Sequence, residues 1–288
     1  MLGPMDQWQI VITGCGTSHG NPPWGVPEWW SDDPKDHRRR SGALLLGPQD
    51  QVILIDTGPD LMHQLRDPFK RWDGVHYPDD CITRCAAVLL THDHADHAHG
   101  LNELRHLNRL MNGNGIPIYG NEQHLYEVTR MYPYCFSTSD ADIYQLATPL
   151  LQTVHVDDFS SVEVCGLPVT LFPMSHGPYG RVSGMRIGNL VYCTDCKTIP
   201  EESVACMHGA EVLVLDMLRE KEHVSHFNWA EAAAVIERVQ PQRTVLVHMG
   251  HEVRHAEWTE RLSQGVEMGF DGWHATFASD GPRWERKA

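Results

Sequence analysis

A dense cluster of metal-binding side chains lies at residues 92–97, where the sequence reads His-Asp-His-Ala-Asp-His. The cluster follows a short apolar segment, 86–90, which is typical of a buried strand. Neutral imidazole and carboxylate groups are good ligands for Zn²⁺, Mn²⁺ and Fe²⁺. One ion cannot use His92, His94, Asp96 and His97 together in comfortable geometry. The spacing therefore indicates two metal ions.

Three further residues of ligand type follow apolar segments later in the chain. They are His176, Asp195 and His248. A single His or Asp after a strand is usually a cap or a satisfied polar group. Several such residues at strand ends in one chain make a role as metal ligands more convincing for each of them. They argue against the alternative that residues 92–97 form a surface turn that binds metal weakly. We therefore expect a metal centre at the ends of several strands, where α/β folds place their sites.

Short apolar segments bounded by Gly, Pro or Asp predict the strands that position these residues. These segments are 8–12, 43–46, 51–55, 86–90, 116–119, 151–156, 161–165, 169–172, 186–187, 190–193, 212–215, 244–247 and 272–277. Helices are expected over 61–66, 101–111, 122–131 and 229–239, the last with Asn228 as its N-cap. The segment 21–40, rich in Pro and Trp, reads as a long loop.

Strands interleaved with helices in two successive halves predict an α/β fold of the four-layer αββα type. In such a sandwich two mixed sheets pack face to face and the helices lie outside. No repeat, linker or low-complexity tract divides the chain, so we expect one domain over residues 1–288.

The composition narrows the classes of partner. With 23 Lys and Arg against 38 Asp and Glu, the formal charge of −15 repels long nucleic acids, although a metal ion can still attract a small anion. The 8 Cys are scattered, which is typical of reduced thiols. Neither a signal-peptide pattern nor a long apolar run is found, so we expect a cytoplasmic protein that makes no contact with membranes.

From Thr13 to His248 the chain resembles the metallo-β-lactamase-fold hydrolases, whose pattern is His-x-His-x-Asp-His followed by a His, an Asp and a final His. The resemblance implies two divalent ions, Zn²⁺ or Mn²⁺ with Fe²⁺ as a further candidate, and a shared hydroxide that attacks the substrate. The implied ligands are His92, His94 and His176 for one ion, Asp96, His97 and His248 for the other, and Asp195 as the bridge. Asp56 matches a family Asp that orients a ligand, but a helix cap is an equal alternative.

Within this superfamily, residues 218–228 and 247–251 are similar to the cyclic-phosphate phosphodiesterases of the bacterial phosphonate pathway. The family's general acid stands 22 residues before the last ligand, the place of His226 here. His223 is a competing candidate, and a bond from His226 to Asn228 or a backbone group is the structural alternative. The family's structural zinc is expected to be absent, because residues 19–40 lack Cys. His251, its matching His, would then line the pocket or pack against the Trp-rich loop.

The leading expectation is therefore a dinuclear phosphodiesterase that acts on a small phosphate ester, with cyclic phosphates among the candidates. A hydrolase of thioesters or lactones and a non-hydrolytic accessory factor in cofactor biosynthesis are the alternatives. The resemblance also suggests a homodimer. Tyr179 is either a substrate contact or a packing residue, and five arginines are either phosphate contacts or solvated side chains. These are Arg38, Arg39, Arg40, Arg181 and Arg186.

Overall fold

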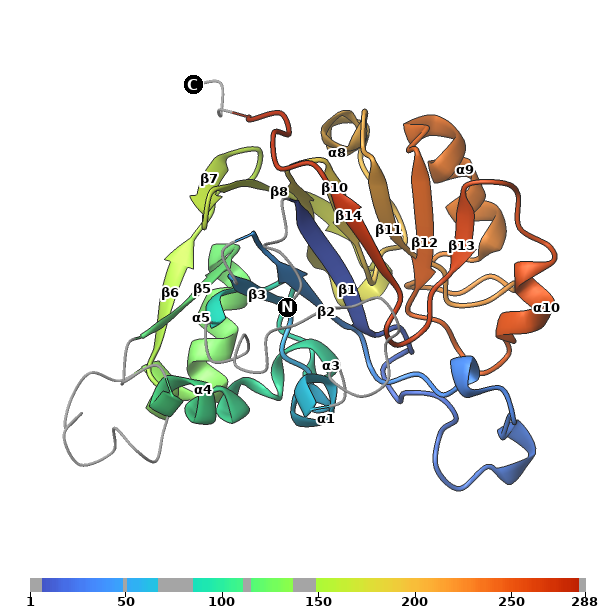
Figure 1. Cartoon of the computed structure of the whole chain (residues 1–288), viewed down its shortest axis with the longest axis horizontal. Helices are drawn as coiled ribbons and strands as arrows, with labels where there is room; N and C mark the ends of the chain where they lie inside the picture. The colour runs from blue at the N-terminus through green and yellow to red at the C-terminus, as the bar shows by residue number, and fades with distance from the viewer. Residues whose placement is uncertain (1–6, 49–50, 67–84, 111–114, 137–148, 285–288) are drawn as a thin grey trace.

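The computed structural model describes residues 7–48, 51–66, 85–110, 115–136 and 149–284, which form two seven-stranded mixed sheets (Figure 1). The first sheet has the strand order β14 (His274–Phe277), β1 (Trp8–Gly14), β2 (Gly42–Leu46), β3 (Val52–Ile55), β4 (Cys85–Leu89), β5 (Ile116–Gly120) and β6 (Leu151–His155). The second has the order β13 (Val266–Met268), β12 (Arg243–Val247), β11 (Val212–Asp216), β10 (Leu190–Cys193), β9 (Arg181–Ile187), β8 (Leu167–Ser175) and β7 (Ser161–Val164).

Helices lie outside the two sheets, so the predicted αββα sandwich is confirmed (Figure 1). The α-helices are α1 (Leu61–Arg66), α3 (Ala95–Ala98), α4 (Leu104–Leu110), α5 (Glu122–Met131), α6 (Pro133–Phe136), α8 (Glu201–Met207), α9 (Trp229–Val239) and α10 (His255–Thr259). No helix in the described ranges is both long enough and apolar enough to cross a membrane.

The core explains why so many strands are continuously apolar. In β1, Ile10 and Ile12 belong to the large apolar cluster that joins the two sheets. Val11, on the opposite face of the same strand, belongs to a second cluster that α1, α4 and α5 cover. Strands buried on both faces lose the usual alternation of apolar and polar residues, and their ends are where polar groups can gather.

The predicted and observed elements agree closely where the apolar pattern is uninterrupted. The helices expected over 61–66, 122–131 and 229–239 have those bounds, and Asn228 forms a capping box with Glu231. The strands expected at 169–172 and 186–187 are shorter than the observed β8 and β9. The observed strands continue through Pro168, Pro173 and Gly184, which are residue types that usually mark the end of a strand. The helix expected over 101–111 begins as a 3₁₀ turn (Leu101–Glu103), and residue 111 lies outside the described residues.

Arg186 is a buried cation that ties the turn between β9 and β10 to the end of α8. Its guanidinium donates hydrogen bonds to the carbonyl oxygens of Gly188 at 2.6 Å and His208 at 2.9 Å, and to Asn189 Oδ1 at 3.0 Å. The side chain is 1% exposed, so it is a structural residue and does not contact substrate.

The Arg186→Met substitution is expected to lower the free energy of unfolding by about 2–4 kcal/mol, because it leaves buried carbonyl oxygens without donors. Urea denaturation of the metal-loaded protein measures this loss. The matched control is Arg130→Met, which removes an exposed ion pair with Glu127 and should cost less than about 1 kcal/mol. Equal losses in the two variants would contradict the structural role of Arg186.

Candidate metal centre

The seven predicted ligands converge at one edge of the sandwich. Residues 92–97 follow β4 and run into α3, while His176, Asp195 and His248 come directly after β8, β10 and β12. In the described part of the chain, four groups have ligand atoms within 4.8 Å of one another, and two of these four include His226. The other two groups consist of predicted ligands alone. They are His92, His94 and His176, and Asp96, His97, Asp195 and His248. These groups match the two ligand sets that the family resemblance implies.

Asp195 lies between the two groups. One of its carboxylate oxygens is 3.1 Å from His248 Nε2 and 4.0 Å from His176 Nε2, and the other is 3.1 Å from His97 Nε2. Both oxygens thus contact the second group, and the one beside His248 also faces His176 of the first group. The position suits a bridge between two ions.

Three strand-end residues of the centre have left-handed backbone conformations. The φ angles are 61° for Asp56, 55° for Asp195 and 60° for His248. A non-glycine residue in this region costs free energy, and such residues concentrate at functional sites. The backbone thus turns sharply after β3, β10 and β12 to direct each side chain into the same space.

The donor atoms fit divalent cations. The Nε2 atoms of His92, His97 and His248 and Oδ2 of Asp96 are buried, and none has a hydrogen-bond partner. Buried polar atoms are normally satisfied, so atoms that crowd together without hydrogen-bond geometry indicate a shared cation. Imidazole and carboxylate donors suit Zn²⁺, Mn²⁺ or Fe²⁺.

The electrostatics of the two groups favour metal binding in different ways. Burial holds the pKa of His92 well below its usual range and lowers the pKa of His176 to about 4, so both imidazoles stay neutral, as ligands must. Burial also opposes protonation of His248, but the carboxylates of Asp195 and Asp96 outweigh it and raise its pKa to about 10. The carboxylates around His248 thus attract positive charge, which a divalent ion would supply.

Neighbouring groups orient the candidate ligands. Asp56 Oδ2 lies 2.7 Å from His97 Nδ1, while Asp56 Oδ1 accepts a hydrogen bond from the backbone N–H of Thr91 at 2.8 Å. The carbonyl oxygen of Ser225 lies 2.9 Å from His176 Nδ1. In both imidazoles the Nδ1 atom is therefore occupied, and Nε2 points toward the centre. Asp56 therefore contacts the cluster, as the orienting role requires.

His226 lies against both ligand groups and is held by a carboxylate that the sequence analysis missed. Its ring stacks on His248 with centroids 4.6 Å apart, and its centroid is 4.7 Å from that of His176. His226 Nδ1 is 3.1 Å from Asp216 Oδ2, which also accepts a hydrogen bond from the backbone N–H of Cys196. Asp216 ends the apolar strand β11, so its signal in the sequence is the same as that of Asp195.

The other candidates lie around this centre. His223 Nδ1 is 3.2 Å from Ser225 Oγ, and the His223 ring centroid is 5.3 Å from that of His226. His251 stacks on Trp29 of the Trp-rich loop, with centroids 3.5 Å apart and planes at 10°. Of the two places expected for His251, the structure therefore shows packing against the loop.

The arginines have partners of their own. Arg38, Arg39, Arg40 and Arg181 pair with Asp36, Asp271, Asp60 and Asp158 respectively. His124, to which no sequence pattern assigns a role, is buried on α5 and bonds through Nδ1 to Asp93 of the 92–97 cluster. This contact joins α5 to the turn that carries the first ligands.

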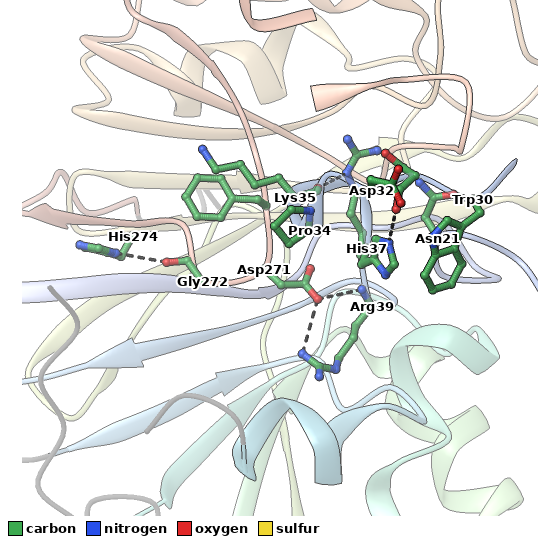
Figure 2. Close-up of a pocket in the computed structure, with 13 residues that line it drawn as sticks. Asn21, Trp30, Asp32, Pro34, Lys35, His37, Arg39, Asp271, Gly272 and His274 are labelled. Atoms are coloured by element: carbon green, nitrogen blue, oxygen red, sulfur yellow. Dashed lines mark hydrogen bonds and ion pairs between the residues drawn. The ribbon is translucent and has the colours of Figure 1, made fainter. Parts of the chain in front are cut away.

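A cavity of about 1000 Å³ lies beside the Trp-rich loop, and none of the candidate ligands lines it (Figure 2). Lys35 Nζ lies 4.5 Å from the ring centroid of Phe270, and Asp271 accepts a hydrogen bond from the backbone N–H of Arg39 at 2.9 Å (Figure 2). Burial raises the pKa of Asp271 to about 7. Asp271 and Arg39 thus hold the loop at this cavity, and the candidate ligands lie elsewhere, in the strand-end cluster.

Comparison with known proteins supports this description. Residues 51–249 match the family described as the Beta-lactamase superfamily domain. An octanoyltransferase of Porphyromonas gingivalis is 30% identical over 279 residues, which cover 96% of this chain and 53% of that protein. The chain thus spans about half the length of this relative.

Two solved structures share the fold. A diphosphatase from the PhnP family is 27% identical, with a TM-score of 0.79 over 94% of this chain and 97% of the other. Zn²⁺-bound PqqB from Methylobacterium extorquens is 19% identical, with a TM-score of 0.68 over 93% and 99%. From the family match, the two-sheet sandwich and the cluster of His and Asp residues, we conclude that this chain belongs to the beta-lactamase superfamily and has the metallo-β-lactamase fold.

Proposed function

We propose that this protein is a dinuclear-metal phosphodiesterase that hydrolyses a small phosphate ester. The observation that carries the proposal is the pair His226 and Asp216 beside two complete ligand groups. A phosphodiesterase needs a charge-neutralising centre for the phosphoryl oxygens and an acid for the leaving oxygen. In this proposal the ligand groups would supply the charge-neutralising centre, and the adjacent His226 would supply the acid.

In this proposal His92, His94 and His176 would hold one ion, Asp96, His97 and His248 would hold the second, and Asp195 would serve both. Two divalent ions would lower the pKa of a bound water and neutralise charge on the phosphoryl group. Zn²⁺ or Mn²⁺ suits the nitrogen and oxygen donors.

The chain's own residues have distinct roles around the reacting group. Asp56 orients the His97 ring and the Ser225 carbonyl orients the His176 ring, so each imidazole presents Nε2. Asp216 occupies Nδ1 of His226, which leaves Nε2 as the atom that donates a proton to the leaving oxygen. His226 is therefore the proposed general acid, and Asp216 is a positioning residue.

Two observations support phosphate chemistry and a small substrate. The diphosphatase from the PhnP family shares 27% of its sequence and nearly the whole fold with this chain. A diphosphate and a phosphodiester both lose an oxygen leaving group from phosphorus, so the same constellation serves either bond. The net charge of −15 disfavours long nucleic acids.

A second candidate is acyl-ester hydrolysis, which the name of the octanoyltransferase relative favours. A panel of bis(p-nitrophenyl) phosphate, a cyclic nucleotide, an octanoyl thioester and a lactone, tested with the Mn²⁺- or Zn²⁺-loaded protein, separates the classes. The proposal requires turnover of the phosphate esters to exceed that of the carboxylic esters. Turnover of the thioester or lactone alone would contradict it.

The Asp216→Asn substitution is expected to lower kcat for a phosphodiester by about 10–100-fold, the usual effect of removing an orienting partner. Asparagine retains an oxygen for the Cys196 N–H but loses the charge that stabilises a protonated His226. Steady-state kinetics and metal analysis should show reduced kcat with full metal content. The control Asp158→Asn removes only the ion pair with Arg181, and an equal loss in that variant would contradict the role of Asp216.

A further inference from the structure

Two exposed side chains, those of Tyr179 and Val224, belong to segments that contact the first ligand group. Tyr179 is 63% exposed at the end of the 3₁₀ turn Gly177–Tyr179, and Val224 is 65% exposed in the segment before His226. The Tyr179 ring centroid lies 5.3 Å from that of His176 and 6.0 Å from that of His94. The Tyr179 ring is therefore an exposed aromatic group beside two of the candidate ligands.

The two segments that carry these side chains are held against each other. A Cβ atom at Gly177 would lie only 2.2 Å from the carbonyl oxygen of Val224, and Gly177 has a φ of +62° that suits glycine. The next carbonyl along, that of Ser225, lies 2.9 Å from His176 Nδ1. This close backbone contact holds the turn that carries Tyr179 against the segment that leads to His226.

The Tyr179 ring is oriented for stacking. Its plane makes an angle of 83° with that of His94, so these two rings meet edge to face, and most of the tyrosine surface remains open to solvent. An aromatic side chain that stays exposed beside a polar centre is available for a ligand. Two small apolar surfaces can cover one ring, whereas a long acyl chain would need a continuous apolar channel.

The proposed general acid lies on the same side. The His176 ring is 5.3 Å from that of Tyr179 and 4.7 Å from that of His226, centroid to centroid. His176 thus contacts both rings, which places Tyr179 within reach of a group bound beside His226. We infer that Tyr179 stacks on a planar aromatic ring in the leaving group of the substrate, an inference that rests on the proposed phosphodiesterase function.

The test uses two synthetic diesters that differ only in the planarity of the leaving group, benzyl methyl phosphate and cyclohexylmethyl methyl phosphate. We expect Tyr179→Ala to lower kcat/KM for the benzyl ester by about tenfold, since stacking on an aromatic side chain contributes an effect of this size. The cyclohexylmethyl ester should change by less than about threefold, and Tyr179→Phe should retain activity on both. Tyr126→Ala, which removes an equally exposed tyrosine from α5, is the matched control.

The outcomes separate this inference from the proposal beneath it. Equal losses on the two esters in Tyr179→Ala, or no loss on either, would overturn the stacking role while the phosphodiesterase stands. If the wild-type protein with its metals bound hydrolyses neither these esters nor bis(p-nitrophenyl) phosphate, the proposed function itself fails. A selective loss on the benzyl ester that Tyr179→Phe does not share would establish the stacking.

Discussion

The His226→Ala substitution is expected to lower kcat for an alkyl phosphodiester by about 10²–10⁴-fold, the usual contribution of a positioned general acid. An alkoxide is a poor leaving group and needs the proton that Nε2 supplies. p-Nitrophenolate leaves without a proton, so the loss on bis(p-nitrophenyl) phosphate should be much smaller. Parallel kinetics on the two kinds of ester measure this difference.

Two controls make this result specific to the acid. Metal analysis of His226→Ala should still give two ions per chain, because Nδ1 of His226 is bonded to Asp216 and the seven ligands are intact. His155→Ala removes a half-exposed histidine that pairs with Asp157 and should leave both rates unchanged. Equal losses on both esters, or none, would show that His226 is not the acid and would turn attention to His223.

The Asp195→Ala substitution is expected to have the largest effect. It removes the carboxylate whose oxygens lie 3.1 Å from both His97 and His248, and with it the charge that would bridge the two ions. We expect fewer than two ions per chain and a loss of turnover of at least about 10³-fold, because the rate enhancement depends on both ions. Metal analysis and kinetics on the same preparation test this.

Asp93→Asn is the matched control for Asp195, since it changes a carboxylate within the 92–97 cluster that belongs to neither ligand group. Asp93 bonds to His124 on α5, so its variant should retain two ions. Full metal content and full turnover in Asp195→Ala would contradict the bridging role.

The ligand groups could be anticipated from the sequence because their signal is local and dense. Three imidazoles and a carboxylate follow β4 within a few residues, and each remaining ligand directly follows an apolar strand. The same signal was present at Asp216 after β11, but one carboxylate at a strand end has many explanations. Only its contact with His226, 10 residues away in the chain, distinguishes it.

Other features depend on tertiary contacts that no local pattern carries. The sequence left Asp56 between a helix cap and an orienting group, and the choice depends on His97, 41 residues away. A tyrosine shortly after His176 in the sequence is as typical of a packing residue as of a substrate contact. Only the exposure of the Tyr179 side chain in the structure shows that it is free for a ligand. The predicted lengths of β8 and β9 are too short, because proline and glycine inside a strand look in the sequence like the end of a strand.

The central claim, a dinuclear centre that hydrolyses phosphodiesters, is tested most directly by titrating the metal-free protein with Mn²⁺ or Zn²⁺ while recording hydrolysis of bis(p-nitrophenyl) phosphate. The two ligand groups predict that turnover rises until two ions are bound per chain and then reaches a plateau. A plateau at one ion, or two bound ions without turnover of any phosphodiester, would contradict the account.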